Sequence, residues 1–177
     1  MMKNLVIVAA TAAFAATAQA ELVVNGGFET GNFSGWTQVG DTGFTSVWGT
    51  ASHGGSFNAY FGPVTPGGIE QALVAAAGSV INVSFWVRSE DELTPNSLNV
   101  TLDGQSVAAL SDITVTDWTQ YSATITVTNA NPVLNFTLTN PNGYTDLDDI
   151  SADIVPAPAS VALLGLGGLL AARRRRA

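Results

Sequence analysis

Apolar and polar residues alternate along several short stretches between residues 21 and 154. In VINVSFWVR (80–88), Ile81, Val83, Phe85 and Val87 fall on one side of an extended chain, and the residues between them fall on the other. The same spacing recurs in SLNVTLD (97–103), YSATITVT (121–128) and VLNFTLT (133–139). Each stretch predicts a β-strand with one face in the core and one in water, as in antiparallel sheets.

Turn-forming residues separate these stretches. They include Pro66-Gly67-Gly68, Thr94-Pro95-Asn96 and Pro141-Asn142-Gly143. Asp103-Gly104 lies between two apolar runs, which is a strong signal for a two-residue β-hairpin. No helical spacing of apolar residues occurs between residues 21 and 155. Many short strands divided by turns predict an all-β sandwich.

The first twenty residues have the features of a secretory signal peptide. Lys3 precedes an apolar run, Leu5–Ala16, and Ala18-Gln19-Ala20 has the small residues of a cleavage site. An ordinary buried helix is the alternative, but such a helix at residue 1 would have no helical partner. We therefore predict a signal peptide at 1–20, cut by signal peptidase, and a single domain over 21–154.

Charge is unevenly distributed along the chain. All fourteen acidic residues lie in the domain, whereas Arg88 is its one basic residue. Such a surface repels phosphate groups, so nucleic acid is excluded as a partner. It attracts cations, of which calcium suits an exported protein, although acidity can serve solubility alone. The chain has no cysteine, which excludes disulfides and thiolate metal sites. Its one histidine, His53, excludes a multi-histidine metal site, and we predict that it lies in a loop.

Three stretches of the domain resemble extracellular carbohydrate-binding modules with a galactose-binding-like jelly roll. They are LVVNGGFETGNFSGW near the start, GIEQALVAAAGSVINVSFWVRS in the middle and YTDLDDISADI at the end. Together they span nearly all of residues 21–154 in the order found in those modules. The resemblance implies an antiparallel jelly-roll β-sandwich, and it bears less on sugar binding because fold does not imply function.

The C-terminal stretch 155–177, VPAPASVALLGLGGLLAARRRRA, resembles the PEP-CTERM sorting signal of bacteria. It has Val155, Pro156 and Pro158 before an apolar run and ends in a cluster of arginines: Arg173, Arg174, Arg175 and Arg176. Ala157 stands where that signal commonly has Glu. The resemblance implies processing by an exosortase-type enzyme in bacteria that make exopolysaccharide.

The apolar run of that tail is short for a permanent membrane anchor. As a helix, Val161–Ala172 would measure about 18 Å, against a hydrocarbon core of about 30 Å. The arginines would stay in the cytoplasm while the domain lies outside. We therefore expect a transmembrane-like helix that holds the protein in the cytoplasmic membrane until an enzyme cuts near Val155-Pro156.

A metal site is predicted at the closing strand. In LDDISADI, alternation places Asp148 on the side of Ile150, Ala152 and Ile154, which should face the core. A carboxylate there needs a partner. The resemblance implies that Glu29 and Asp148, with Asp149 as alternate, hold a structural calcium ion. The alternative is that Asp148 caps loop amides with no metal.

A sugar site is predicted on a sheet face, because sugars bind beside flat aromatic rings and polar side chains. Trp86 and Arg88 point outward in their predicted strand, and Asn99 is expected on a neighbouring strand. Rim aromatics are Trp48, Tyr60 and Trp118. The alternative is that a loop covers Trp86.

Three functions can be considered for such a domain. The first is an exported, non-catalytic cell-surface or extracellular-matrix protein that associates with exopolysaccharide. The second is a structural or adhesive matrix protein without specific sugar binding. The third, a polysaccharide hydrolase, needs two carboxylates facing across a cleft, whereas Glu90, Asp91 and Glu92 are consecutive. We therefore expect no enzyme activity.

Overall fold

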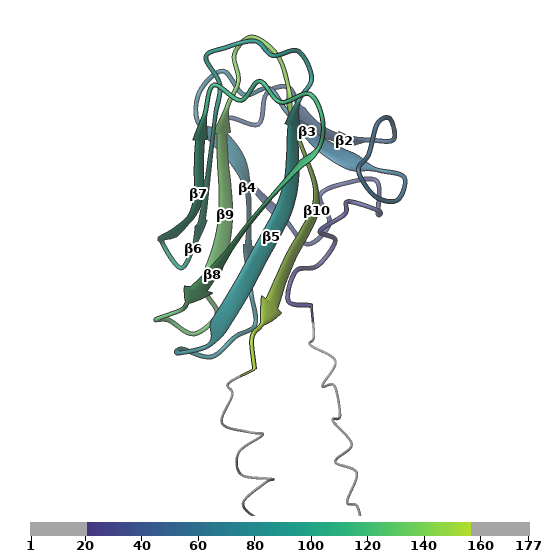
Figure 1. Cartoon of the computed structure of the whole chain (residues 1–177). Helices are drawn as coiled ribbons and strands as arrows, with labels where there is room; N and C mark the ends of the chain where they lie inside the picture. Colours follow the sequence, from purple (N-terminus) through teal and green to yellow (C-terminus); the bar gives the residue numbers. More distant parts are fainter. Residues whose placement is uncertain (1–20, 157–177) are drawn as a thin grey trace, which may run out of the picture.

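A computed structural model describes residues 21–156, which form a sandwich of two five-stranded sheets (Figure 1). Its strands are β1 Thr37–Gly40, β2 Thr45–Trp48, β3 Asn58–Phe61, β4 Gly67–Ala72, β5 Val80–Ser89, β6 Ser97–Leu102, β7 Gln105–Ser111, β8 Thr119–Thr126, β9 Val133–Thr139 and β10 Thr145–Ile154. One sheet has the order β1-β4-β9-β6-β7 and the other β2-β3-β10-β5-β8. All named pairings are antiparallel, which confirms the predicted all-β sandwich.

The chain crosses from one sheet to the other at almost every connection after β3, as in jelly rolls. From β4 to β10, β6 and β7 are the one consecutive pair that stays in the same sheet. Asp103 and Gly104 join this pair, and both have positive φ angles, 55° and 73°. A two-residue turn of that kind matches the twist of a hairpin, so the predicted turn is confirmed.

The core lies between the sheets and consists of the apolar faces that alternation predicted. In β5, every second residue from Ile81 to Val87 is fully buried, and β6 and β9 contribute leucines, Val100 and Phe136 from the opposite sheet. Phe85 meets Phe136 edge to face across the interface, with ring centroids 5.3 Å apart. Each such side chain contributes about 1.5–3 kcal/mol of transfer free energy on burial.

A β-bulge in β10 changes the predicted direction of Asp148. Asp148 pairs with Trp86 and Ser151 with Ser84, so two residues of β10 oppose the single residue Phe85. Because paired residues share a face, Asp148 lies with Trp86 on the outer face. The expectation that it shares the core side with Ile150 and Ala152 is therefore wrong, although those two residues are buried in the core.

The two ends of the described chain leave the sandwich at the same end (Figure 1). Glu21 forms an isolated bridge with Asp153, and the Val155 amide donates to Val80 O at 2.8 Å. Within residues 21–156, no helix is long and apolar enough to cross a membrane. The predicted signal peptide, with Ala18 and Ala20, and the tail from Ala157 onward lie outside the described residues.

Candidate functional site

Aromatic side chains gather on the outer face of the sheet that contains β5. Trp48 of β2 and Tyr60 of β3 have ring centroids 4.9 Å apart, and Tyr144, just before β10, lies 5.2 Å from Tyr60. Trp86 of β5 and Trp118, just before β8, lie farther along the same side. We call these five residues the aromatic face. Trp48 is 37% exposed and the other four are half-buried, so this face combines ring surface with access to solvent.

The loop 49–57 covers Trp86. His53 stacks on its ring at 3.8 Å and 18°, and Trp118 lies edge-on to His53 at 5.9 Å. The Trp118 indole N–H donates to Ala51 O at 3.2 Å, which holds the loop down. His53 is thus a loop residue as expected, and Trp86 adopts the covered arrangement that was the alternative to a sugar platform.

Arg88 is bound to an acidic partner on the neighbouring strand. Its Nη2 and Nε atoms lie 2.6 and 2.7 Å from Asp146 Oδ2, and Glu90 lies 3.8 Å away. Burial raises the pKa of Asp146 to about 7, against the lowering effect of the Arg88 hydrogen bond and charge. The Arg88 guanidinium also lies 5.2 Å from the Trp118 ring centroid, within the range of a cation–π contact.

Asn99 lies on the opposite side of the molecule. It belongs to β6 in the other sheet, where it pairs with Ala109 and Thr137, whereas the neighbours of β5 are β10 and β8. The expectation that Asn99 lies on a strand next to Trp86 is therefore wrong. We call the surface formed by Glu70, Asn99, Asn135 and Thr137 the polar face. On it, the Thr137 hydroxyl donates to Asn135 Oδ1 at 2.7 Å, and Asn135 Nδ2 donates to Glu70 Oε2 at 3.3 Å.

Each of the three candidate metal ligands contacts the loop 49–57. Glu29 Oε1 accepts hydrogen bonds from the Ser56 and Phe57 amides at 2.9 and 3.0 Å. Asp148 Oδ2 accepts from the His53 and Gly54 amides at 2.8 and 3.1 Å. Asp149 Oδ2 lies 2.6 Å from His53 Nδ1. The two contacts of Asp148 are the amide capping that was the alternative interpretation of this residue.

The loop fits against the carboxylates because it contains glycine. A Cβ atom on Gly54 would lie 2.6 Å from Asp149 Oδ2, and one on Gly55 would overlap the Glu29 carboxylate. Asp148 is fully buried beneath the loop. Burial raises its pKa to about 6, against the lowering effect of hydrogen bonds from the amides of Gly54, Asp149 and His53.

Asn58 is a residue that sequence reasoning did not single out. Leu147 pairs with Ala59, so the next residues along the two strands, Asp148 and Asn58, are neighbours on the outer face. Asn58 is fully buried, and neither polar atom of its side chain has a hydrogen-bond partner within the described residues. The alternation of the strand could have indicated Asn58, because this polar residue precedes Ala59 and Phe61, which face the core.

Residues 21–156 contain no cluster of three or more His, Cys, Asp or Glu arranged to hold a metal.

Comparison with known proteins identifies relatives of the domain. A family model described as a carbohydrate binding domain (CBM_4_9) matches residues 20–143. No curated protein matches the chain.

Many solved structures resemble this chain in fold, and three of them illustrate the likeness. The CBM22-1 xylan-binding domain of Xyn10C from Paenibacillus barcinonensis is 22% identical, with a TM-score of 0.60 over 81% of this chain and 99% of that one. TmCBM61 in complex with β-1,4-galactotriose is 19% identical, with a TM-score of 0.61 over 77% and 99%. A family 16 carbohydrate binding module is 20% identical, with a TM-score of 0.56 over 74% and 98%.

Proposed function

The chain belongs to the family of carbohydrate-binding domains matched by residues 20–143, and from this membership we propose that it is a non-catalytic module that binds a polysaccharide outside the cell. One observation of the structure carries the proposal: aromatic rings gather on one outer sheet face, beside charged and polar side chains. A pyranose presents an apolar face to such a ring and hydroxyl groups to the polar side chains around it.

The accessible part of the aromatic face is the contact surface in this proposal. Trp48, Tyr60 and Tyr144 form a continuous series of rings, and Trp48 is the most exposed of them. Trp86 and Arg88 are less available to a ligand, since His53 covers the first and Asp146 binds the second.

We propose a neutral polysaccharide as the ligand. All fourteen acidic residues lie in the domain, so polyanionic chains are repelled. Two similar structures are a xylan-binding domain and a complex with β-1,4-galactotriose, and the latter is an uncharged oligosaccharide.

Affinity electrophoresis of the full chain tests this function. Native gels contain xylan, galactan or the exopolysaccharide of the producing bacterium, and a non-sugar detergent keeps the chain in solution. Retardation is expected, and Trp48→Ala should weaken it by about 2 kcal/mol, roughly thirtyfold in Kd.

Asn99→Ala is the matched control, because it changes an exposed residue on the polar face and should leave retardation unchanged. Loss with Asn99→Ala but not with Trp48→Ala would move the site to the polar face. Absence of retardation in every gel would favour the structural or adhesive function.

We propose calcium as a structural ion beneath the loop 49–57. The support is the convergence of Glu29, Asp148 and Asp149 on this loop, together with the unpartnered amide of buried Asn58. Carboxylate and amide oxygens are the ligands that calcium prefers. When bound, the ion would neutralise charge and hold the loop against the sheet.

We also propose that the protein is exported and sorted. Signal peptidase would cut after Ala20, and an exosortase-type enzyme would cut near Val155-Pro156 while the apolar run holds the chain in the cytoplasmic membrane. The sequence supports this through the prolines, the apolar run and the arginine cluster of the tail. The binding domain would then lie at the cell surface or in the extracellular matrix, next to exopolysaccharide.

A further inference from the structure

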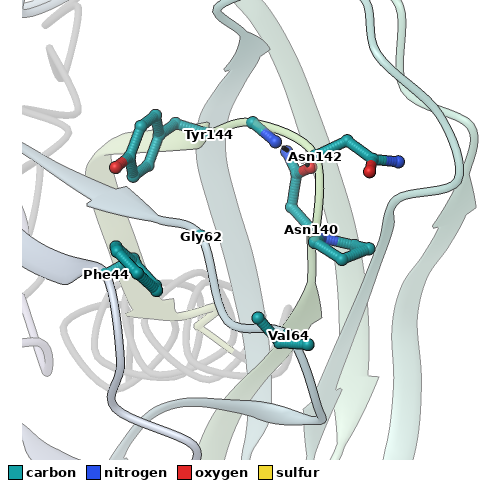
Figure 2. A pocket seen from close by; sticks show the side chains of 8 residues that line it. Phe44, Gly62, Val64, Asn140, Asn142 and Tyr144 are labelled. Carbon is teal, nitrogen blue, oxygen red and sulfur yellow. Dashed lines mark hydrogen bonds between the residues drawn. The ribbon is translucent and has the colours of Figure 1, made fainter.

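A pocket lies at one end of the sandwich, where the connections before β2, after β3 and before β10 meet. It has a volume of about 200 Å³ and is lined by Phe44, Gly62, Val64 and residues 140–144 (Figure 2). We call it the end pocket. Because β10 runs from Thr145 beside the pocket to Ile154 beside the termini, the end pocket is at the far end from both described termini (Figure 1).

Hydrogen bonds fix the loops that form the end pocket. Asp41 Oδ2 accepts from the Val64 and Thr65 amides, each at 3.1 Å. The Gly62 amide donates to Phe44 O at 2.9 Å. On the other side, Asn142 Nδ2 donates to Thr94 O at 2.9 Å. A ligand would therefore meet a preformed surface and would not have to order these loops.

Phe44 is the least expected residue of the end pocket. Its φ angle is 54°, a left-handed conformation that is unfavourable for a bulky side chain, and its side chain is 67% exposed. The strained backbone and the exposed aromatic ring both raise the free energy of the folded protein. Backbone strain of this kind is typical of functional positions.

The lining of the end pocket combines aromatic rings with one exposed side-chain amide, that of Asn142. Asn140 is buried, and its amide is hydrogen-bonded to Thr145 and to the Gly143 backbone. Figure 2 shows the rings of Phe44 and Tyr144 on one side of the hollow and the side chains of Asn140 and Asn142 on the other. Gly62 allows the Tyr144 ring to lie close to the backbone, since a Cβ atom there would be 2.9 Å from that ring. Asn142 is exposed, and while its Nδ2 donates to Thr94 O, its Oδ1 can accept a hydrogen bond from a hydroxyl group.

We infer that the end pocket binds one neutral pyranose ring, at the end or on a side branch of the polysaccharide. This inference rests on the proposed function and assigns it a second contact site. Pockets that enclose drug-sized ligands have volumes of about 300–1,000 Å³, so about 200 Å³ suits one ring and not a chain segment. Tyr144 belongs to both the end pocket and the aromatic face, so a chain lying on that face can place its terminal ring in the pocket.

The test is an NMR titration of the isotope-labelled full chain, in a non-sugar detergent, with methyl pyranosides of galactose, glucose, mannose and xylose at millimolar concentrations. At least one of them should shift the amide signals of Gly62 and Gly143 in a saturable way. Phe44→Gly should abolish these shifts while keeping or raising the melting temperature, because glycine favours the left-handed backbone. Val74→Ala, which changes an 82% exposed valine at the other end of the sandwich, should leave them unchanged.

Two results would overturn the inference: no saturable shift at Gly62 or Gly143 with any of the four sugars, or shifts that persist in Phe44→Gly. These outcomes are distinct from failure of the proposed function, which is read from retardation of the wild-type chain in polysaccharide gels. Retardation without pocket shifts would refute the end pocket alone. Pocket shifts without retardation would leave the end pocket standing and refute polysaccharide binding at the aromatic face.

Discussion

Asp148 shows how one residue can serve the fold while lying outside the core. It is fully buried, yet it lies on the outer face of its sheet, where the loop 49–57 covers it. Its carboxylate accepts hydrogen bonds from the backbone amides of His53, Gly54 and its own neighbour Asp149. These bonds offset the loss of water only in part, because burial is the largest influence on its pKa and raises it to about 6.

The raised pKa of Asp148 predicts a pH dependence of stability. Between its ordinary value of 3.8 and about 6, the folded state keeps a proton that the unfolded state has lost. The free energy of unfolding should therefore fall as pH rises from about 4 to about 6, and the contribution of Asp148 should be constant above that window. Denaturant melts of the full chain in EGTA, at a series of pH values, would measure it.

Asp148→Asn is the variant that isolates this effect. Its amide oxygen can still accept from the loop amides, but it does not titrate, so the fall in stability between pH 4 and 6 should be smaller than in the wild type. The comparison is needed because burial also raises the pKa of Asp146, which adds a change of the same sign. Parallel pH profiles for the two proteins would contradict the raised pKa of Asp148.

At the scale of elements, the loop 49–57 connects the two candidate sites. Its His53 covers Trp86, and its backbone amides bind Glu29 and Asp148. The N-terminal segment, the loop and β10 are far apart in sequence, so their meeting depends on the fold of the whole domain. Any ion beneath the loop would therefore stabilise the aromatic face as well as the contact between the loop and β10, the central strand of its sheet.

Calcium is predicted to stabilise the domain through this loop. The melting temperature of the full chain should rise in calcium relative to EGTA, since an ion at one hundred times its Kd contributes about 2.7 kcal/mol. Glu29→Gln should reduce the rise by removing a charged ligand. Asp103→Asn, at the hairpin between β6 and β7, is the control and should retain it. Equal melting temperatures in calcium and EGTA would exclude the ion.

At the scale of the whole molecule, the sequence predicted local features better than those that depend on distant pairing. Period-two alternation located β5, β6, β8 and β9, and Asp103-Gly104 located a hairpin, because both patterns are set by neighbouring residues. Asn99 was placed beside Trp86 because alternation gives the direction of a side chain but not the sheet that its strand joins. The side of the sheet on which Asp148 lies was predicted wrongly for a related reason. The bulge in β10 that sets it exists only in the pairing of β10 with β5.

The candidate sites were predicted only in part. Glu29, Asp148 and Asp149 contact the same loop, 49–57, but residues 21–156 contain no group of three such residues arranged to hold a metal, so the calcium site stays a prediction. Trp48, Tyr60 and Trp118 lie on the same side as Trp86. The contact of His53 with Trp86 and the burial of Asn58 were not foreseen, because each depends on how a loop folds over a sheet.

If the tail is a sorting signal, the protein recovered from the cell surface or matrix should begin at Glu21 and end near Val155-Pro156, without the arginine cluster 173–176. The described domain should remain folded after the cut, because its last backbone hydrogen bond to the sheet is donated by Val155. Intact-mass spectrometry of both termini would measure this, with replacement of the four arginines by alanine as the processing-deficient variant. A mature form in the membrane that still carries Arg176 would instead identify the tail as a permanent anchor, and the domain would then bind polysaccharide while tethered to the cell.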